Sequence, residues 1–250
     1  SVPVWRRCDG SVSSAAPLRP DRLKQPRDAG FGAGIVDDIH HRMGGQLDVA
    51  VFDKTASNPQ AHIDIAIALF VDRAPEVALN LHVGGMPAIE RGLMDGRFQV
   101  GILPTHRSSQ SLVYETLFGE DMRLYAGASH PLFAAEHAAL DWDALRAWPF
   151  AGLGYHSPNM ELGHRERLPR KATGFDQESI ATLILSGRYL GFLPDHYAEA
   201  FERRGQMRPI RPELFFYRCE FVSVLRRSPQ PARAAQAFAQ CLREAHEAPS

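Results

Sequence analysis

The sequence predicts an α/β protein with two lobes joined by extended strands. Two series of alternating strand-like and helix-like segments carry this prediction, the first over 47–103 and the second over 112–245. Such alternation is typical of parallel sheets whose strands are connected by helices in right-handed crossovers. A chain of 250 residues has room for one or two domains, and its core needs no disulfide or metal to hold it.

The first series opens with a short apolar strand at 47–52 and the polar loop Asp53–Asn58. Asn58 and Pro59 predict a helix start there, because Asn is a strong N-cap residue and Pro suits the first helical position. One helical face then follows from apolar side chains spaced by four, three and four residues, namely Ile63, Ile67, Phe70 and Ala74.

Strict alternation of apolar residues over 77–83 predicts a half-buried second strand. A second helix begins after the turn 84–87 and ends at Asp95 and Gly96, and the apolar run 98–103 predicts a third strand buried on both faces. In sheets of this kind, ligands bind at the carboxyl ends of the strands. We therefore expect a binding site at the three strand ends, which are 53–58, 84–86 and 104–106.

The second series begins with two extended segments, 112–118 and 122–126, separated by Gly119. A long strand over 215–225 lies near the end of the chain. These extended segments are expected to join the two lobes. The other predicted elements are helices at 141–148, 179–186, 194–205 and 231–245, strands at 150–153 and 190–193, and an extended piece at 173–175.

The chain has 28 Lys and Arg residues against 29 Asp and Glu, so its net charge is −1. This balance excludes bulk electrostatic attraction to nucleic acid or to an anionic membrane as the main binding force. Its three cysteines form no Cys-x-x-Cys motif, which argues against a disulfide framework or a zinc site. No apolar run is long enough to cross a membrane, so we expect a cytoplasmic protein without a membrane partner.

Residues 1–45 differ from the rest of the chain. Over 1–34 they are rich in Pro, Gly and Ser and show no apolar spacing typical of a helix or a strand. We expect a disordered or non-native segment, because it has too little apolar surface to offset the entropy of ordering. The alternative is a short basic arm that contacts phosphates.

The loop after the first strand is the clearest candidate for ligand contact. Its backbone N–H groups and the hydroxyls of Thr55 and Ser57 are predicted to converge at the positive end of a helix, which suits an anion or a carboxylate. The alternative is that Asn58 only caps the helix.

The sequence carries no recognisable signal of catalysis. It has no Gly-x-Ser-x-Gly elbow, no His-Glu-x-x-His motif and no glycine-rich phosphate loop that follows a strand. His156, Glu161 and His164 are spaced too loosely for a metal site, and no nucleophile can be paired with a base. We therefore expect no enzyme, no cofactor, and no catalytic or metal-ligating residue.

Three segments carry motifs whose order and spacing are specific together, although each motif alone is weak. The first joins a helix to a strand through Asp-Gly, the second is a strand followed by His-Pro-Leu, and the third is a strand that ends in Pro. They are Leu93–Ile102, Leu124–Phe133, and Gly191–Pro194 with Gly205, Met207 and Pro209. Together they resemble the effector-binding region of LysR-type transcriptional regulators, and the resemblance covers about 36–246.

The resemblance implies a two-lobed fold like that of type II periplasmic binding proteins, with a central cleft for a small effector. Lobe I would comprise 46–118 and 211–247, and lobe II 119–210. A homodimer is implied, with a tetramer as a further option, in which 59–83 of one subunit packs on the second lobe of the other. The effector is expected to be a carboxylate or an aromatic metabolite.

The family's pocket positions carry over to eight residues of this chain. Three lie in the loop after the first strand, one at the end of the third strand, and four on the cleft side of the second lobe. In that order they are Thr55, Ser57 and Asn58; Thr105; and Phe175, Asp176, Gln177 and His156.

The sequence departs from the family at its N-terminal end. Members begin with a winged helix-turn-helix and a long linker helix, whereas 1–45 shows no such module beyond a candidate linker-helix remnant at 35–43. We therefore expect this chain to bind an effector and itself but not operator DNA, which is a partner by resemblance alone. We interpret the chain as a fragment or the product of a disrupted reading frame.

Two other functions stay open at this point. One is a solute-binding protein of the same fold in the periplasm, and the other is a small-molecule enzyme such as a dehydratase. The sensor is favoured because the sequence shows neither a signal peptide nor a nameable acid–base pair.

Overall fold

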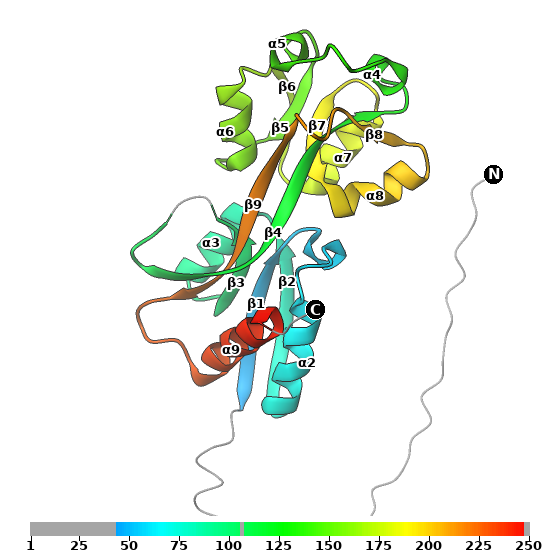
Figure 1. The fold of residues 1–250 in the computed structure, drawn as a ribbon. Helices are drawn as coiled ribbons and strands as arrows, with labels where there is room; N and C mark the ends of the chain where they lie inside the picture. The colour runs from blue at the N-terminus through cyan, green and yellow to red at the C-terminus, as the bar shows by residue number, and fades with distance from the viewer. Residues whose placement is uncertain (1–43, 106–107, 248–250) are drawn as a thin grey trace, which may run out of the picture. The chain divides into compact units, whose positions relative to one another are not determined.

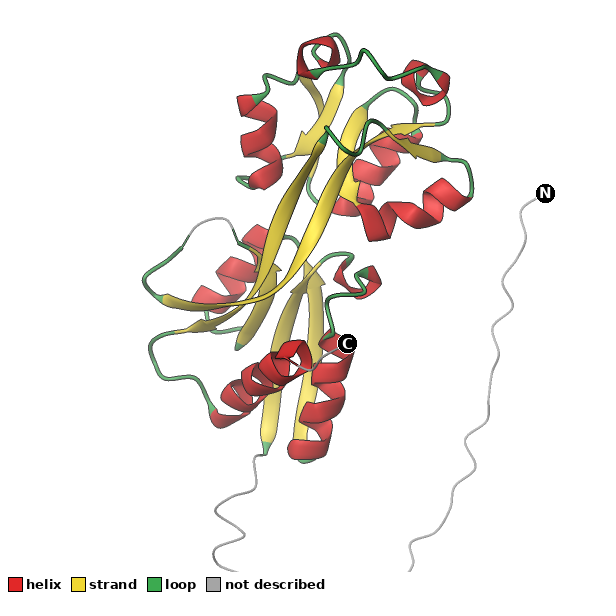
Figure 2. Ribbon diagram, viewed as in Figure 1, coloured by secondary structure: helices red, strands yellow, loops and turns green. Residues whose placement is uncertain are grey.

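The computed structural model describes residues 44–105 and 108–247, which form a continuous mixed sheet flanked by helices (Figure 1, Figure 2). Within these residues the strand order is β2-β1-β3-β9-β4-β7-β5-β6, and β8 pairs with β4. The α/β class predicted from the sequence is therefore confirmed. Apart from residues 44 and 45, the predicted N-terminal segment 1–45, with its candidate helix at 35–43, lies outside the described residues.

The first part of the sheet is parallel, as predicted. β1 (Gly45–Phe52) lies between β2 (Val77–Gly84) and β3 (Val100–Pro104) and pairs in parallel with both. α2 (Ile63–Arg73) and α3 (Met86–Met94) connect these strands. The carboxyl ends of the three strands therefore lie along one edge, where a ligand is expected.

The C-terminal helix α9 (Arg233–Glu247) packs beside α2 and covers this part of the sheet (Figure 1). Phe70 and Phe238 meet edge to face with their ring centroids 5.3 Å apart, and both are fully buried. Phe118 and Phe221 stack at 4.7 Å on the long strands beside them. This aromatic core fixes the position of β1 and thus of the loop that follows it.

Two long antiparallel strands, β4 (Leu112–Gly127) and β9 (Phe216–Arg226), lie in the middle of the sheet and connect its two parts (Figure 1). The sequence predicts two segments divided at Gly119, but β4 is a single strand, in which Gly119 pairs with Glu220. The irregularity in β4 lies just before Gly119, as a shift in the pairing register between Thr116 and Phe118. The Arg218 guanidinium lies over Gly119, in the space that a Cβ would occupy.

The second part of the sheet is also mainly parallel. β5 (Phe150–Leu153) pairs in parallel with β6 (Arg170–Gly174) and β7 (Leu190–Pro194), and β7 is antiparallel to β4. β8 (Met207–Pro209) pairs with β4 beyond β7. The helices of this part are α4 (Pro131–Ala134), α5 (Trp142–Leu145), α6 (Pro158–Arg165), α7 (Gln177–Leu185) and α8 (Asp195–Arg203).

The predicted start of the first helix is wrong. α2 begins at Ile63, and the loop before it contains only the short 3-10 helix η1 (Thr55–Ser57). Asn58 does not cap α2, because its Oδ1 accepts a hydrogen bond from the Gln60 N–H at 2.9 Å and its amide donates to the Gly119 carbonyl at 3.5 Å. Asparagine thus closes a local turn and ties the loop to β4.

α6 has no counterpart among the predicted elements. Its buried face consists of Asn159, Leu162 and Gly163, so the usual apolar periodicity is missing. Ser157 caps it, with its Oγ accepting from the Met160 N–H at 3.3 Å, and Pro158 occupies the first turn. The predicted helix 141–148 is also shorter than expected, since α5 spans one turn.

We refer to β1–β3 with α2, α3 and α9 as lobe I, and to β5–β8 with α4–α8 as lobe II. β4 and β9 cross between them (Figure 2). The boundaries predicted at 118 and 211 stay a prediction. Among the described residues no helix has the length and apolar character required to span a membrane.

Candidate functional site

A small cavity lies between the lobes, where the ends of β1 and β3 approach the first residues of α6 and α7. Its volume is about 20 Å³, enough for about one water molecule. Apolar side chains form much of the wall, including Met86 and Pro104 of lobe I. We call it the cleft cavity, and its polar lining includes Glu120, Tyr155, Asn159, Gln177 and Tyr217.

Asp53 follows β1 directly and connects the two lobes beside this cavity. Its Oδ2 accepts a hydrogen bond of 2.7 Å from the backbone N–H of Gln177, the first residue of α7. Its side chain is buried, and Oδ1 has no hydrogen-bond partner. Burial raises the pKa of Asp53 to about 6, although the Gln177 N–H opposes that rise.

Two further buried polar atoms near Asp53 also have no hydrogen-bond partner. They are the Tyr155 hydroxyl and the Gln177 Oε1, and both side chains line the cleft cavity. Burial raises the pKa of Tyr155, and the negative charges of Asp53 and Asp176 raise it further. Because buried polar groups in proteins are normally hydrogen-bonded, three such atoms in one place need an explanation.

Other polar groups of the cavity are satisfied. The Asn159 Oδ1 accepts from the Leu153 N–H at 3.0 Å, and its amide donates to the Tyr217 hydroxyl at 3.4 Å. The cavity-lining residues with an unpartnered buried atom are therefore Tyr155 and Gln177, and Asp53 is bonded to the Gln177 N–H beside them.

The loop after β1 holds the lobes together at three points. Besides the bond from Gln177 to Asp53, Lys54 forms an ion pair with Glu178 of α7. Ser57 Oγ lies 2.9 Å from His196 Nδ1 at the start of α8. These contacts join neighbouring residues of one short loop to two helices of lobe II, so the structure describes a closed arrangement.

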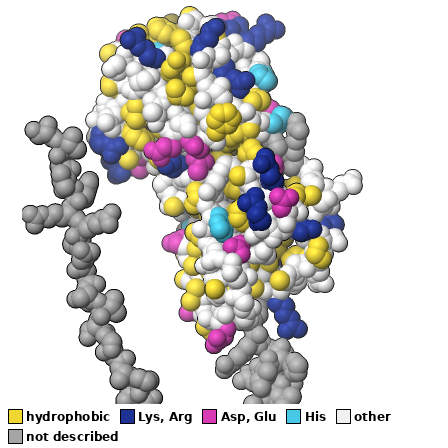
Figure 3. All heavy atoms as spheres, turned by 180° about the vertical axis from the view of Figure 1, so that it is seen from behind, with side chains coloured by type: hydrophobic (Ala, Val, Ile, Leu, Met, Phe, Trp, Pro, Cys, Tyr) yellow, Lys and Arg dark blue, Asp and Glu magenta, His cyan; other side chains and the backbone are white. Residues whose placement is uncertain are grey.

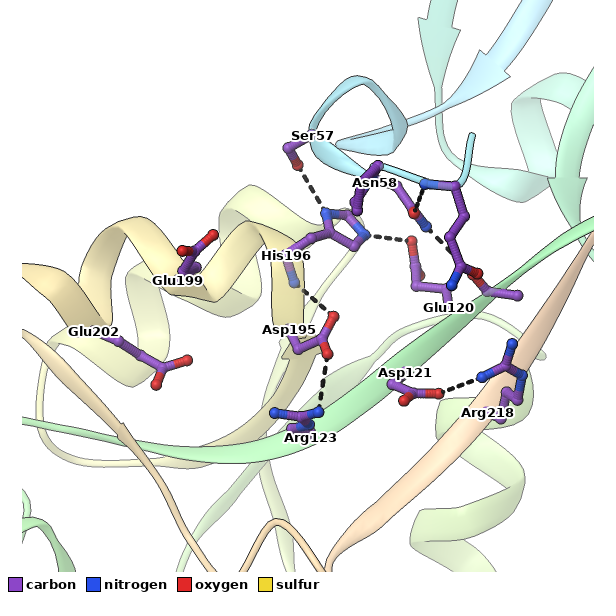
Figure 4. Close-up of a pocket in the computed structure, with 13 residues that line it drawn as sticks. Ser57, Asn58, Glu120, Asp121, Arg123, Asp195, His196, Glu199, Glu202 and Arg218 are labelled. Atoms are coloured by element: carbon purple, nitrogen blue, oxygen red, sulfur yellow. Dashed lines mark hydrogen bonds and ion pairs between the residues drawn. The ribbon is translucent and has the colours of Figure 1, made fainter. Parts of the chain in front are cut away.

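His196 continues this connection to the crossing strands, as Figure 4 shows. Its Nε2 lies 2.9 Å from Glu120 Oε2, and both side chains are buried. Ser57, His196 and Glu120 thus form one hydrogen-bonded chain from lobe I through lobe II to β4.

A larger groove of about 550 Å³ lies on the other side of this chain, and we call it the side groove. It is lined by the labelled residues of Figure 4, which are Ser57, Asn58, Glu120, Asp121, Arg123, Asp195, His196, Glu199, Glu202 and Arg218. Seen from behind, acidic side chains gather near the level where the lobes meet (Figure 3).

Most charges of the side groove already have partners. Arg123 lies 3.1 Å from Asp195, and Arg218 lies 3.0 Å from Asp121. The Tyr125 hydroxyl donates to a Glu202 oxygen at 3.0 Å. In contrast to the cleft cavity, no buried side-chain atom without a partner lies among the described residues that line this groove.

Of the residues predicted as ligand contacts, Gln177 lines the cleft cavity and Asp176 adjoins it. Asp176 caps α7, with its Oδ1 accepting from the N–H and Oγ of Ser179 at 2.7 and 2.6 Å, and these bonds lower its pKa. Phe175 is 65% exposed and lines neither pocket.

The hydroxyls of the first loop turn back on their own backbone. Thr55 Oγ1 donates to the Phe52 carbonyl at 2.6 Å, and Ser57 Oγ contacts both the Lys54 carbonyl and His196. Ser57 and Asn58 line the side groove. The predicted anion cradle does not form as described, because η1 is a single short turn and the two hydroxyls already have partners.

Thr105 and His156 lie apart from the other predicted residues. Thr105 is exposed, and its N–H donates to the Glu220 carbonyl at 2.7 Å. His156 lines a groove of about 440 Å³ next to the cleft cavity, where its Nε2 lies 3.4 Å from a Glu161 oxygen. Whether any of the eight residues contacts a ligand stays a prediction.

Sequence reasoning missed Asp53 and Tyr155. Both follow a strand directly or within two residues, at the edge where ligands bind, so their position was a usable signal. Cys219 and Cys241 are unpaired and buried, and burial raises the pKa of both thiols. No cluster of metal-ligating side chains occurs in the described ranges.

Comparison with known proteins shows the family. The model of the LysR substrate binding domain matches residues 40–247. The HTH-type transcriptional activator BauR of Pseudomonas aeruginosa is 29% identical over 209 residues, which are 84% of this chain and 68% of BauR.

Solved structures share the fold. The regulatory domain of Synechocystis PCC6803 CcmR in complex with 2-PG superposes with a TM-score of 0.63 at 18% identity, over 81% of this chain and 98% of that one. The cofactor-binding domain of the Cbl transcriptional regulator has the same TM-score and identity, over 89% and 99%. The two-lobed fold expected from the resemblance is thereby confirmed.

Proposed function

The chain belongs to the LysR substrate-binding domain family, and from this premise we propose that it senses a small metabolite held in the cleft between its lobes. The ligand would bond to Asp53 on lobe I and to Gln177 on lobe II at once. Because it would contact both lobes only when they are together, it would shift the population towards the closed arrangement. That shift would then be passed to transcription.

A single observation carries this proposal. Three buried polar atoms without partners, on Asp53, Tyr155 and Gln177, lie where the loop after β1 closes on α7. Leaving such atoms unpaired costs about 1–3 kcal/mol each, and a ligand that pairs them recovers this free energy. The site therefore gains more from a ligand than the side groove, whose described lining residues have no buried side-chain atom without a partner.

We propose binding rather than turnover as the role of the cleft, in the cytoplasm, where transcription takes place. Support comes from BauR, which is named a transcriptional activator and not an enzyme. DNA contact would belong to another module of the working regulator, as the term HTH-type indicates for BauR.

The proposed partner of lobe I is a second copy of the chain. α2 and the edge strand β2 expose the apolar side chains of Ile65, Val71, Leu81 and Val83, which are between 44% and 68% exposed. An edge strand with such a face invites pairing or packing. Sedimentation should show a dimer that Val83→Asp dissociates, whereas Val113→Asp on β4 leaves it intact; a wild-type monomer would contradict the dimer.

A thermal-shift screen of small metabolites tests the effector site. A true effector should stabilise the folded state by RT ln(1 + [L]/Kd), so Tm should rise with ligand concentration. Gln177→Leu, which keeps the backbone bond to Asp53, should lose most of that shift, whereas Gln206→Leu on an exposed turn should keep it. A ligand that stabilises Gln177→Leu as strongly as the wild type would contradict the site.

A further inference from the structure

We propose that the cleft cavity binds the ammonium group of a primary amine, with Asp53 Oδ1, Gln177 Oε1 and the Tyr155 hydroxyl as its three acceptors. This inference rests on the proposed function, because it concerns the ligand class of the same site. It differs from the carboxylate or aromatic effector expected from the sequence.

The hydrogen-bonding capacity of the three atoms points to a donor. An ionised carboxylate oxygen and an amide carbonyl oxygen can only accept, and a hydroxyl can accept as well. All three are buried and have no partner. An ammonium group has three donors and no acceptor, so it matches this set, whereas a carboxylate ligand would leave Asp53 and Gln177 unpaired.

The charges around the cavity favour the same ligand. Two buried acidic side chains lie here, Glu120 in the wall of the cavity and Asp53 beside it, bonded to the Gln177 N–H. No Lys or Arg is among the described residues that line it, and Lys54 is engaged by Glu178. A cation would compensate the buried charge of Asp53, while an anion would add repulsion to a site that already disfavours charge.

The size of the cavity fits an ammonium head with a tail that leaves it. About 20 Å³ admits one small polar group and no more. Met86 and Tyr155 line both the cavity and the neighbouring groove of about 440 Å³, so the two are adjacent. The groove also carries Pro87, Met94 and Tyr114, which would contact the carbon chain of the amine.

Four probes with the same carbon skeleton test the inference: n-butylamine, 4-aminobutyrate, butyrate and n-butanol. Binding to the full chain is measured by calorimetry and thermal shift at constant ionic strength. We expect the two amines to bind. Butyrate and n-butanol should bind at least about tenfold more weakly, which corresponds to about 1.4 kcal/mol.

Variants distinguish the loss of a hydrogen-bond acceptor from a loss of folding. Asp53→Asn and Tyr155→Phe should each weaken n-butylamine binding, with a loss of at least about tenfold for Asp53→Asn. Glu76→Gln removes the same charge from an exposed loop at the opposite end of β2 and should bind n-butylamine like the wild type. Circular dichroism and Tm show whether each variant is folded.

Three results would overturn the proposal of an amine ligand. The first is tighter binding of butyrate than of n-butylamine, and the second is equal binding of n-butylamine by Asp53→Asn and wild type. The third is no binding of either amine up to about 50 mM, a limit well above millimolar affinity. The first result, if Gln177→Leu abolishes butyrate binding, would leave the cleft as the effector site. Binding unaffected by Asp53→Asn, Tyr155→Phe and Gln177→Leu together would count against the cleft itself.

Discussion

The cleft cavity and the side groove lie on two sides of Glu120, and they differ in an instructive way. The side groove has more than twenty times the volume of the cleft cavity, about 550 against 20 Å³. Yet its charges pair with one another, as Arg123 does with Asp195, while the cleft cavity holds the unpartnered groups. Incomplete hydrogen bonding, and not the size of a pocket, is therefore the better indicator of where a ligand binds.

The largest expected contrast is in stability, because replacing a polar side chain should have opposite effects in the two regions. Asp53→Asn should stabilise the unliganded protein at pH 7, by at most about 3 kcal/mol from a pKa raised from 3.8 to about 6. Asparagine keeps an acceptor for the Gln177 N–H but carries no buried charge. Urea unfolding measures the difference, and a loss of stability on this change would contradict the burial cost assigned to Asp53.

The pH dependence of that contrast has a definite sign. A carboxyl whose pKa is higher in the folded state takes up more protons there, so its stability cost is absent below about pH 4 and complete above about pH 6. The gain from Asp53→Asn should therefore grow between those values. A gain that is constant from pH 4 to 7 would assign the effect to packing.

In the side groove, removing the partner of a buried carboxylate should destabilise the protein. His196→Ala leaves Glu120, a buried carboxylate, without its partner at 2.9 Å, and also removes the contact with Ser57. We expect a loss of about 2 kcal/mol in urea unfolding. A change smaller than about 0.5 kcal/mol, the usual effect of a surface substitution, would show that this chain does not hold the lobes together.

The pH dependence of amine binding should come from the ionisation of Asp53 at the cleft. Asp53 must be ionised to attract an ammonium group, so affinity should fall by about tenfold per unit below pH 6, or about 1.4 kcal/mol, and level off above it. The charged or titratable groups of the described residues that interact with Asp53 are Lys54, Asp176, Glu120, Tyr155 and Tyr197. Calorimetry with n-butylamine from pH 5 to 8 measures this, and an affinity independent of pH would separate binding from Asp53.

The smallest effect is expected at the rim of the side groove. Glu199→Gln changes an exposed residue whose only ion pair identified in the structure is with Arg203, at 3.5 Å. Stability should change by less than about 0.5 kcal/mol, and n-butylamine should bind unchanged. A large loss of binding would move the ligand from the cleft to the groove.

Features that depend on local sequence patterns could be predicted, whereas features that depend on tertiary contacts could not. The parallel arrangement of β1, β2 and β3 follows from local patterns, such as the alternation over Val77–Val83, and the structure confirms it. α6 was missed because its buried face includes Asn159 and Gly163 in place of a repeating apolar stripe. The helix start at Pro59 was wrong because Asn58 uses its side chain for a turn and for β4.

The candidate site shows the same limit. Local patterns correctly placed the loop 53–58 at the carboxyl edge of the parallel strands, and Gln177, one of the eight predicted residues, lines the cavity. Asp53 and Tyr155 were not selected, because their significance comes from burial and from missing partners. Those properties arise only when lobe II closes on the loop, which brings together residues more than a hundred positions apart.

Hydrogen–deuterium exchange with and without n-butylamine tests most directly whether the ligand joins the lobes at the cleft. We expect slower exchange in both the loop after β1, residues 53–57, and the start of α7, residues 176–179, with little change in α8. Protection confined to α8 and the side-groove part of β4, or to one lobe alone, would contradict it.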